Sequence, residues 1–235
     1  MAVVTISGQV GTGAHDVGRL AAQRLQIDYV DQEILVAAAR ALGVSMESII
    51  SFDERTASLS ERLAAMLRRF LERSAAAGAA DPMLGSDGLD ILLSRTYSEA
   101  AGEGLDEVPD DRYLAALGDI IRDLAGHDNV LIIGRGSQVI LKDWPGALHV
   151  LLVAQPEERV ADIARRQGLP EEQARSEVEG REKGRVNFHR QFFKVDVNDP
   201  SRYHLTLNTA CFSSEEAAEI ISETARRVAV EGRPS

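Results

Sequence analysis

Three glycines close to the start of the chain have the spacing of a site that binds phosphate. The segment ISGQVGTGAHD (residues 6–16) overlaps the end of an apolar run, Val3–Ser7, and places glycines at positions 8, 11 and 13. A glycine-rich turn between a strand and a helix lets backbone N–H groups point inward, and the first helical turn adds a partial positive charge that attracts anions. The segment therefore predicts a loop that holds nucleotide phosphates through its backbone.

One residue that such a loop ordinarily uses is missing. A phosphate-binding loop of the form G-x-x-x-x-G-K-[ST] has a lysine after its last glycine, whereas this chain has Ala14, followed by His15 and Asp16. Backbone N–H groups can still hold phosphate, but the positive charge must then come from elsewhere in the chain. The alternative is that the glycines only form a tight strand-to-helix turn.

A basic run in the second half of the chain is one possible source of that charge. Residues 181–194 (REKGRVNFHRQFFK) contain five basic residues and one acidic residue, in a chain whose formal net charge is −11. Guanidinium groups suit phosphoryl oxygens because they offer paired N–H donors, although a charged run is also typical of a solvated helix face. Both interpretations stay open. The basic residues are Arg181, Lys183, Arg185, Arg190 and Lys194.

A second candidate source is a single arginine between two glycines. The segment IIGRGS (residues 132–137) places Arg135 at the end of an apolar strand-like run. Open parallel sheets bind ligands at the carboxyl ends of their strands. We therefore predict that Arg135 lies at a ligand site rather than at a surface turn.

Alternating elements position these residues. Apolar runs separated by helical patterns of period 3.6 indicate crossover units and a buried parallel sheet. Roughly a hundred residues separate the second and third strands, far more than one crossover needs, so the excess is expected to be an inserted helical subdomain. Strands are expected at Val3–Ser7, Asp28–Val30, Val130–Gly134, Leu148–Val153 and His204–Asn208. Helices are expected at 17–25, Ile34–Leu42, Leu59–Phe70 and Asp110–Leu124, and after the starts at Gln155 and Ser213.

Composition limits the classes of protein to which the chain can belong. Hydrophobic residues make up 44% of its 235 residues and charged residues 27%, which is ordinary for a globular domain. No apolar run approaches the roughly 20 residues of a membrane span and no secretion signal opens the chain, so we expect a cytoplasmic protein with no membrane partner. The negative net charge argues against broad nucleic-acid binding. The single cysteine, Cys211, excludes an intramolecular disulfide and is expected to be buried and inert.

The order and spacing of these segments resemble the cytidylate kinase-like family, relatives of the P-loop nucleoside monophosphate kinases, over nearly the whole chain. The glycine loop and its helix, residues 6–25, resemble the family's phosphate loop. IDYVDQEIL (27–35) resembles the second strand and the acidic entry to the monophosphate region, and VLIIGRGSQVILKD (130–143) the strand that carries the monophosphate-binding arginine. EGREKGRVNFHRQFF (179–193) resembles the arginine-rich lid, and DPSRYHLTLNT (199–209) the final strand.

This resemblance implies an α/β chain with the P-loop NTPase three-layer fold. The expected sheet has five parallel strands, and the fold adds a helical monophosphate-binding insertion and a short lid. The implied division of the 235 residues is a core of residues 1–30, 111–165 and 199–235, an insertion of residues 31–110, and a lid of residues 166–198.

The resemblance also implies an activity, namely phosphoryl transfer from ATP to a nucleoside monophosphate, CMP or dCMP, with Mg²⁺. Asp31 and Arg135 would bind the acceptor, and Arg181, Arg185 and Arg190 would act on the transferring group. The donor phosphates would be held by Gly8, Gly11, Thr12, Gly13, Ala14, His15 and Asp16. Protonated His15 would imitate the missing lysine, and Asp16, at the usual threonine position, is a candidate Mg²⁺ ligand through water.

Two alternatives to a cytidylate kinase keep the same fold. Phosphoryl transfer depends on positioning and charge neutralisation more than on a covalent catalyst, so loss of one cation is compatible with a slow enzyme. The same loss is compatible with a nucleotide-binding module that has no turnover. Gly136 follows Arg135 where classical cytidylate kinases have aspartate, which is compatible with a kinase of another small acceptor.

Overall fold

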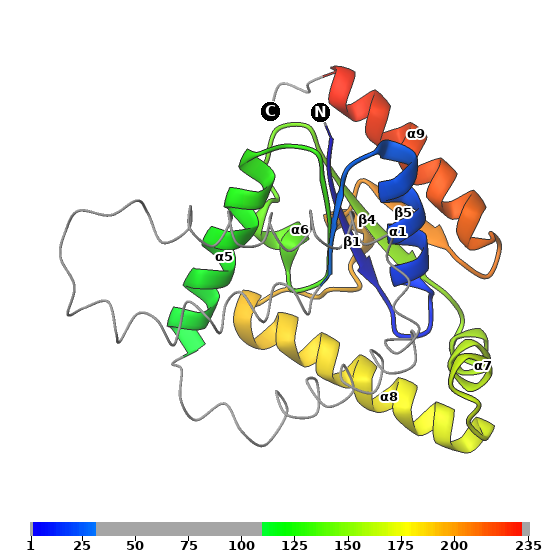
Figure 1. The fold of residues 1–235 in the computed structure, drawn as a ribbon. Helices are drawn as coiled ribbons and strands as arrows, with labels where there is room; N and C mark the ends of the chain where they lie inside the picture. The colour runs from blue at the N-terminus through cyan, green and yellow to red at the C-terminus, as the bar shows by residue number, and fades with distance from the viewer. Residues whose placement is uncertain (1, 32–109, 232–235) are drawn as a thin grey trace, which may run out of the picture.

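The strands form one parallel sheet. The structure is a computed structural model in which residues 2–31 and 110–231 are described. The five strands within these ranges are all parallel and lie in the order β2-β3-β1-β4-β5 (Figure 1). All five strands predicted from apolar runs are confirmed, with ends that differ by at most one residue. The strands are β1 (Val3–Gly8), β2 (Asp28–Val30), β3 (Val130–Ile133), β4 (Ala147–Val153) and β5 (Leu205–Asn208).

Helices follow the strands, as parallel pairing requires. The predicted helices at Ile34–Leu42 and Leu59–Phe70, and the insertion 31–110 apart from its two end residues, lie outside the described residues. The α-helices are α1 (Ala14–Leu25), α5 (Asp110–Gly126), α6 (Ser137–Ile140), α7 (Pro156–Gln167), α8 (Glu171–Phe188) and α9 (Ser214–Glu231). The remaining helical turns are the π-helix η1 (His189–Phe193), which continues α8, and the 3-10 helix η2 (Pro200–Arg202).

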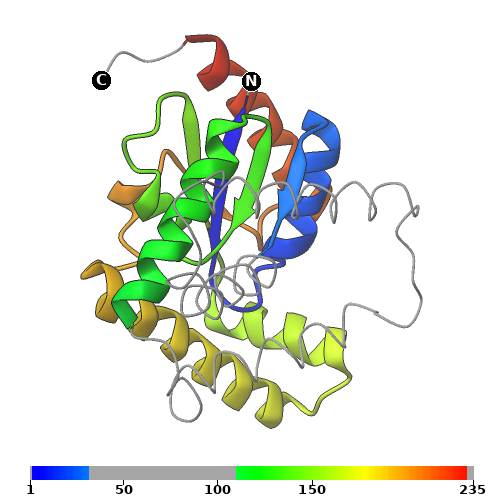
Figure 2. The same cartoon turned by 60° about the vertical axis from the view of Figure 1, so that its left-hand side comes forward.

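Alternate side chains of β1 enter two hydrophobic clusters, one on each face of the sheet. Helices α1 and α9 cover one face of the sheet and α5 covers the other (Figure 2). Val4 and Ile6 pack with side chains of α1 and α9, whereas Val3 packs with side chains of α5. Burial on both faces explains why the strands are continuous apolar runs. Helix, sheet and helix thus form the three layers of the expected P-loop NTPase fold.

Two predicted helix starts are confirmed by their capping contacts. At the start of α7, the backbone N–H of Gln155 donates to the Glu158 carboxylate at 3.2 Å. At the start of α9, the Ser213 N–H donates to the Glu216 carboxylate at 2.8 Å, and the Glu216 N–H donates back to the Ser213 hydroxyl at 3.2 Å. These reciprocal bonds satisfy N–H groups that have no partner inside the helix.

Helices α7 and α8 pack against each other and lie beyond the carboxyl ends of the strands (Figures 1 and 2). Their shared apolar contact is small and consists of Val160, Ile163, Ala174 and Val178. We call α7, α8 and η1 together the α7–α8 unit, residues 156–193. It includes most of the predicted lid.

A buried histidine connects the neighbouring strands β1 and β4. The ring of His149 on β4 donates from Nε2 to the Leu141 carbonyl at 3.1 Å, and its Nδ1 accepts from the Thr5 hydroxyl of β1 at 2.8 Å. The exposed ring of His204 stacks on it with a centroid distance of 4.9 Å. Burial, with the nearby His204, lowers the pKa of His149 from 6.5 to about 4. These contacts give His149 a structural role in the sheet.

The expectation of a buried cysteine is wrong. Cys211 is exposed, because it lies in the turn between β5 and α9, next to the exposed Phe212. Apolar character alone did not predict its environment, because Cys211 lies in a turn outside the strands and helices.

Within residues 2–31 and 110–231, no helix is both long enough and apolar enough to span a bilayer.

Candidate functional site

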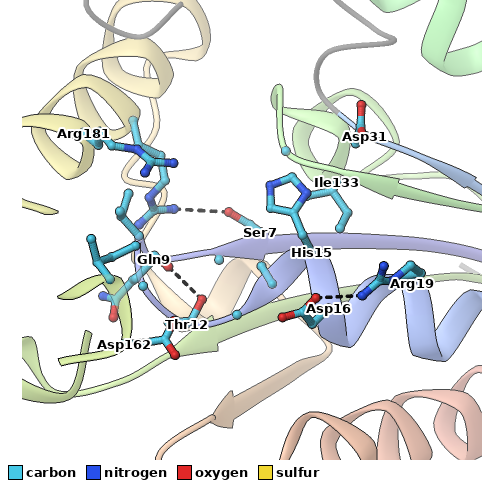
Figure 3. A pocket seen from close by; sticks show the side chains of 18 of the residues that line it. Ser7, Gln9, Thr12, His15, Asp16, Arg19, Asp31, Ile133, Asp162 and Arg181 are labelled. Carbon is cyan, nitrogen blue, oxygen red and sulfur yellow. Dashed lines mark hydrogen bonds and ion pairs between the residues drawn. The ribbon is translucent and has the colours of Figure 1, made fainter. Parts of the chain in front are cut away.

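A cavity of about 300 Å³ lies at the carboxyl end of the sheet, between the glycine loop and the α7–α8 unit (Figure 3). Arg181 and Asp31 lie on opposite sides of it in Figure 3. Arg190 does not line the cavity and is exposed on η1. All the other predicted site residues line it, namely Gly8, Gly11, Thr12, Gly13, Ala14, His15, Asp16, Asp31, Arg135, Arg181 and Arg185.

The shape of the glycine loop depends on its glycines. Gly11 has a φ of +87° and Gly13 a φ of +67°, values that side chains strongly disfavour. A Cβ on Gly11 would lie 2.5 Å from the carbonyl oxygen of Arg159 on α7. The Thr12 hydroxyl closes the turn by donating to the Gln9 carbonyl at 2.7 Å. The loop therefore takes this path only because no side chain blocks it.

A carboxylate of the α7–α8 unit contacts the loop directly. Glu182 accepts a hydrogen bond from the backbone N–H of Val10 at 3.0 Å, and it pairs with Arg185 at 2.7 Å and with Arg159 at 3.7 Å. Burial alone would raise the pKa of Glu182, but the bond from Arg185 and the other partners outweigh burial and lower it. Glu182 thus stays charged and joins α8 to the loop.

Arg185 is held from three directions. Its side chain is only 6% exposed, and it donates to Glu182, to the Ser7 hydroxyl of β1 at 3.2 Å and to the Asn198 side chain. Arg181, one helical turn earlier, contacts Glu177 at 3.2 Å. The two arginines line the cavity together, as their spacing of four residues predicts.

The turn after β3 is locally strained. Gly134, Arg135 and Gly136 have φ values of +73°, +51° and +72°, and a left-handed arginine costs about 1–2 kcal/mol. The Arg135 guanidinium lies 5.4 Å from the Phe188 ring centroid, a cation–π distance. A Cβ on Gly136 would lie 2.2 Å from the Phe193 ring. Such strain at a cavity wall supports a functional role for this turn.

Sequence reasoning missed His189, which lines the same cavity at the start of η1. Its ring is only 2% exposed; Nδ1 donates to the Arg185 carbonyl at 2.9 Å, and Nε2 has no hydrogen-bond partner within the described part of the chain. Burial, with charge from Arg185 and Arg135, lowers the pKa of His189 from 6.5 to about 4. The neutral ring therefore presents an acceptor nitrogen beside two arginines. The π-helical turn that buries it has no sequence signal.

Sequence reasoning also missed a charged cluster beside Gly13. Arg166, in the last turn of α7, donates from Nε to Asp162 at 2.7 Å and from Nη1 to Asp16 at the start of α1. Burial alone would lower the pKa of Arg166, but both carboxylates outweigh it and raise the pKa further. These three residues line the cavity. The contact joins positions 150 residues apart, so spacing in the sequence gives no sign of it.

Comparison with known proteins gives one family over most of the chain. The model of the cytidylate kinase-like family matches residues 3–211. The cytidylate kinase of Aeropyrum pernix is 34% identical over 106 residues, a match that covers 45% of this chain and 60% of that relative, so the chain spans about three fifths of its length. The cytidylate kinase of Archaeoglobus fulgidus is 22% identical over 93% of this chain and 91% of its own.

Solved structures confirm the fold. An uncharacterized protein from Eubacterium ventriosum superimposes with a TM-score of 0.63 at 15% identity, covering 96% of this chain and 98% of that chain. At 15% identity, this similarity supports the fold alone.

Proposed function

Because the chain belongs to the cytidylate kinase-like family, we propose that it transfers a phosphoryl group from ATP to a nucleoside monophosphate, with CMP or dCMP as the acceptor. The observation that carries this proposal is the cavity shared by two turns, the glycine loop after β1 and the Arg135 turn after β3. These strands are neighbours in the sheet, with Ile6 opposite Ile133. Donor and acceptor phosphates bound at the two turns would therefore lie side by side.

The donor phosphates bind at the glycine loop in this proposal. Gly8, Gly11, Thr12 and Gly13 curve the backbone around the anion, and the N-terminus of α1 at Ala14 faces the same cavity. The Thr12 hydroxyl is occupied by the Gln9 carbonyl. The loop thus contributes mainly through its backbone.

The acceptor binds on the side of β2 and β3. Arg135 offers the forked guanidinium that suits a phosphate, and Asp31, at the end of β2, offers a carboxylate to hydroxyl or amino groups. Both residues line the cavity. The positive φ of Arg135 supports the view that this side chain is retained for binding.

Arg181 and Arg185 neutralise the transferring group in this proposal, because phosphoryl transfer depends on fixed positive charge near the equatorial oxygens. Arg185 acts while held by Glu182 and Ser7, which fixes its position before substrate binds. Arg190 has no part in the proposal because it lies outside the cavity lining.

Mg²⁺ fits the acidic side of the cavity. Asp16 and Asp162 offer carboxylate oxygens, and Mg²⁺ takes most of its remaining ligands from water and substrate phosphates. No group of three or more metal-binding side chains occurs within the described ranges, which agrees with binding through one or two carboxylates. The ion would neutralise charge on the phosphates when bound.

An acceptor panel tests the proposal. ADP release is measured with CMP, dCMP, UMP, AMP and GMP, and ATP binding is measured by calorimetry. Turnover with CMP or dCMP is expected; ATP binding without turnover on any acceptor would favour the non-catalytic module.

A substitution then tests the acceptor side. Arg135→Lys keeps the charge but loses the fork, so the acceptor KM should rise about 10- to 100-fold while ATP affinity stays unchanged. Arg226→Lys, on the exposed side of α9, is the matched control. An unchanged KM in the Arg135 variant would place the acceptor phosphate elsewhere.

A further inference from the structure

We propose that Arg166 supplies from α7 the positive charge that the glycine loop lacks, and that its guanidinium binds the donor phosphates. The inference deepens the proposed function and rests on it. It assigns the compensating charge to a residue 152 positions after Ala14, the place where a phosphate-binding loop ordinarily has its lysine.

The position of the guanidinium carries the inference. Nη2 of Arg166 lies 3.2 Å from the point where a Cβ on Gly13 would stand, and it is the nearest atom to that point. The other two nitrogens, Nε and Nη1, are held by Asp162 and Asp16. The two carboxylates therefore fix the plane of the guanidinium with its third nitrogen toward the loop.

Other cations of the cavity are less suited to this task. His15 would need to be protonated, and its Nδ1 already lies 3.1 Å from the Tyr29 hydroxyl. Arg181 and Arg185 belong to α8 and contact Glu177 and Glu182 on that helix. Arg166 combines a permanent charge with a position next to Gly13.

The carboxylates that hold Arg166 also set a condition for its use. Asp16 and Asp162 offset the charge of Arg166, and they also pair with Arg19 and Arg165, so the five side chains carry a combined charge of +1. A divalent cation that enters with ATP and binds these carboxylates would leave the guanidinium to contact the phosphate oxygens. Binding of ATP should therefore depend on Arg166 most strongly when a divalent cation is present.

The simpler alternative is that Arg166 only joins α7 to α1 through Asp16. A lysine placed at Ala14 separates the two roles, because it returns charge to the loop but makes no bridge between the helices. The experiment compares four proteins, namely the wild type, Arg166→Gln, Ala14→Lys and the double variant. Equilibrium binding of ATP with Mg²⁺ is measured by calorimetry, and Tm is measured for each protein.

Arg166→Gln should weaken ATP binding about 10- to 100-fold, the loss expected for a charged hydrogen bond. The double variant should bind ATP more tightly than Arg166→Gln does. If Arg166→Gln weakens binding 100-fold, the added Ala14→Lys should restore at least a factor of ten. Arg165→Ala is the matched control, since Arg165 is adjacent, 73% exposed, pairs with the same Asp162 and does not line the cavity. Its affinity for ATP should equal that of the wild type.

The outcomes separate the inference from the function on which it rests. Equal ATP affinity in the wild type and in Arg166→Gln would overturn the role of Arg166 and leave the nucleotide site standing. A loss that Ala14→Lys does not rescue, accompanied by a lower Tm, would also overturn it in favour of the bridging role. A wild-type protein that binds no ATP would instead refute the proposed function itself.

Discussion

The two sides of the cavity are built in different ways. The glycine loop, residues 8–13, is shaped by its own residues. Its φ values require glycine, and the Thr12 hydroxyl donates to the Gln9 carbonyl three residues away. The α7–α8 unit is positioned largely by charged side chains whose partners are distant in sequence, such as Glu182 with Val10 and Arg166 with Asp16. The first side is sensitive to added atoms, most of all at Gly11, whereas the second depends on intact pairs of charges.

This difference predicts which substitutions will damage each side of the cavity. Steric substitutions should damage the loop, and removal of one partner should damage the α7–α8 unit. The two sides also meet, because Arg159 donates to the Val10 carbonyl at 3.4 Å and the Val10 N–H donates to Glu182 at 3.0 Å. A change on either side is therefore expected to reach the other through these contacts.

The largest expected effect is steric and falls on the loop. Gly11→Ala should lower the free energy of unfolding by about 4 kcal/mol, because a left-handed residue and a 2.5 Å clash with the α7 backbone act together. Gly13→Ala should cost only about 1 kcal/mol, since the nearest atom is the flexible tip of Arg166 at 3.2 Å. Chemical denaturation of both variants measures the difference. Equal losses would show that contact with α7 does not constrain the loop.

The next effect concerns a broken pair in the α7–α8 unit. Arg185→Ala leaves the Glu182 carboxylate largely buried without its main partner, and should lower the free energy of unfolding by about 3 kcal/mol. Adding Glu182→Gln should restore part of the loss. Arg175→Ala, which removes an exposed pair on the same helix, should cost less than about 0.5 kcal/mol. A double-mutant cycle that shows no coupling between residues 182 and 185 would contradict the charge-based view of this side.

The last expected effect is gradual and appears in the pH dependence of stability. His149 and His189 have folded pKa values of about 4, below the 6.5 of an unfolded histidine. Between these values the unfolded chain binds the protons, so stability is complete above pH 6.5 and falls as the pH drops toward 4. Each histidine should contribute a slope of about 1.4 kcal/mol per pH unit. Denaturation curves from pH 7 to 4.5 measure it.

Variants of the two histidines assign the slope of stability against pH to the sheet and to the cavity. His149→Gln and His189→Gln should each remove about half of it. Inorganic phosphate should raise the pKa of His189, which faces the cavity, and leave that of His149 in the sheet unchanged, as followed by NMR of the ring signals. A phosphate response at His149 alone would contradict the assignment of the anion site to the cavity.

The same difference between local and distant contacts decides which features could be predicted from the sequence. The strands, the glycine loop and the Arg135 turn were predictable because their signals, apolar runs and glycines, are local. Arg166 and His189 were not, since a pair 150 residues apart and a π-helical turn leave no pattern in the sequence. The basic run misled in one place. Arg190 follows Arg185 by five residues and lies in the π-helix η1, so the spacing of a regular α-helix does not place it on the face of Arg185.

The register of the sheet has a consequence for how substrate choice can change. Ile6 of β1 lies opposite Ile133 of β3, and each strand ends within two residues of that pair. The glycine loop and the Arg135 turn thus leave the sheet one strand spacing apart, about 4.8 Å. In the proposed function, this spacing sets the distance between the donor and acceptor phosphates. The spacing depends on β1 and β3 alone, and both strands lie outside residues 32–109 in the sequence, so we expect a chimera that exchanges residues 32–109 to keep it.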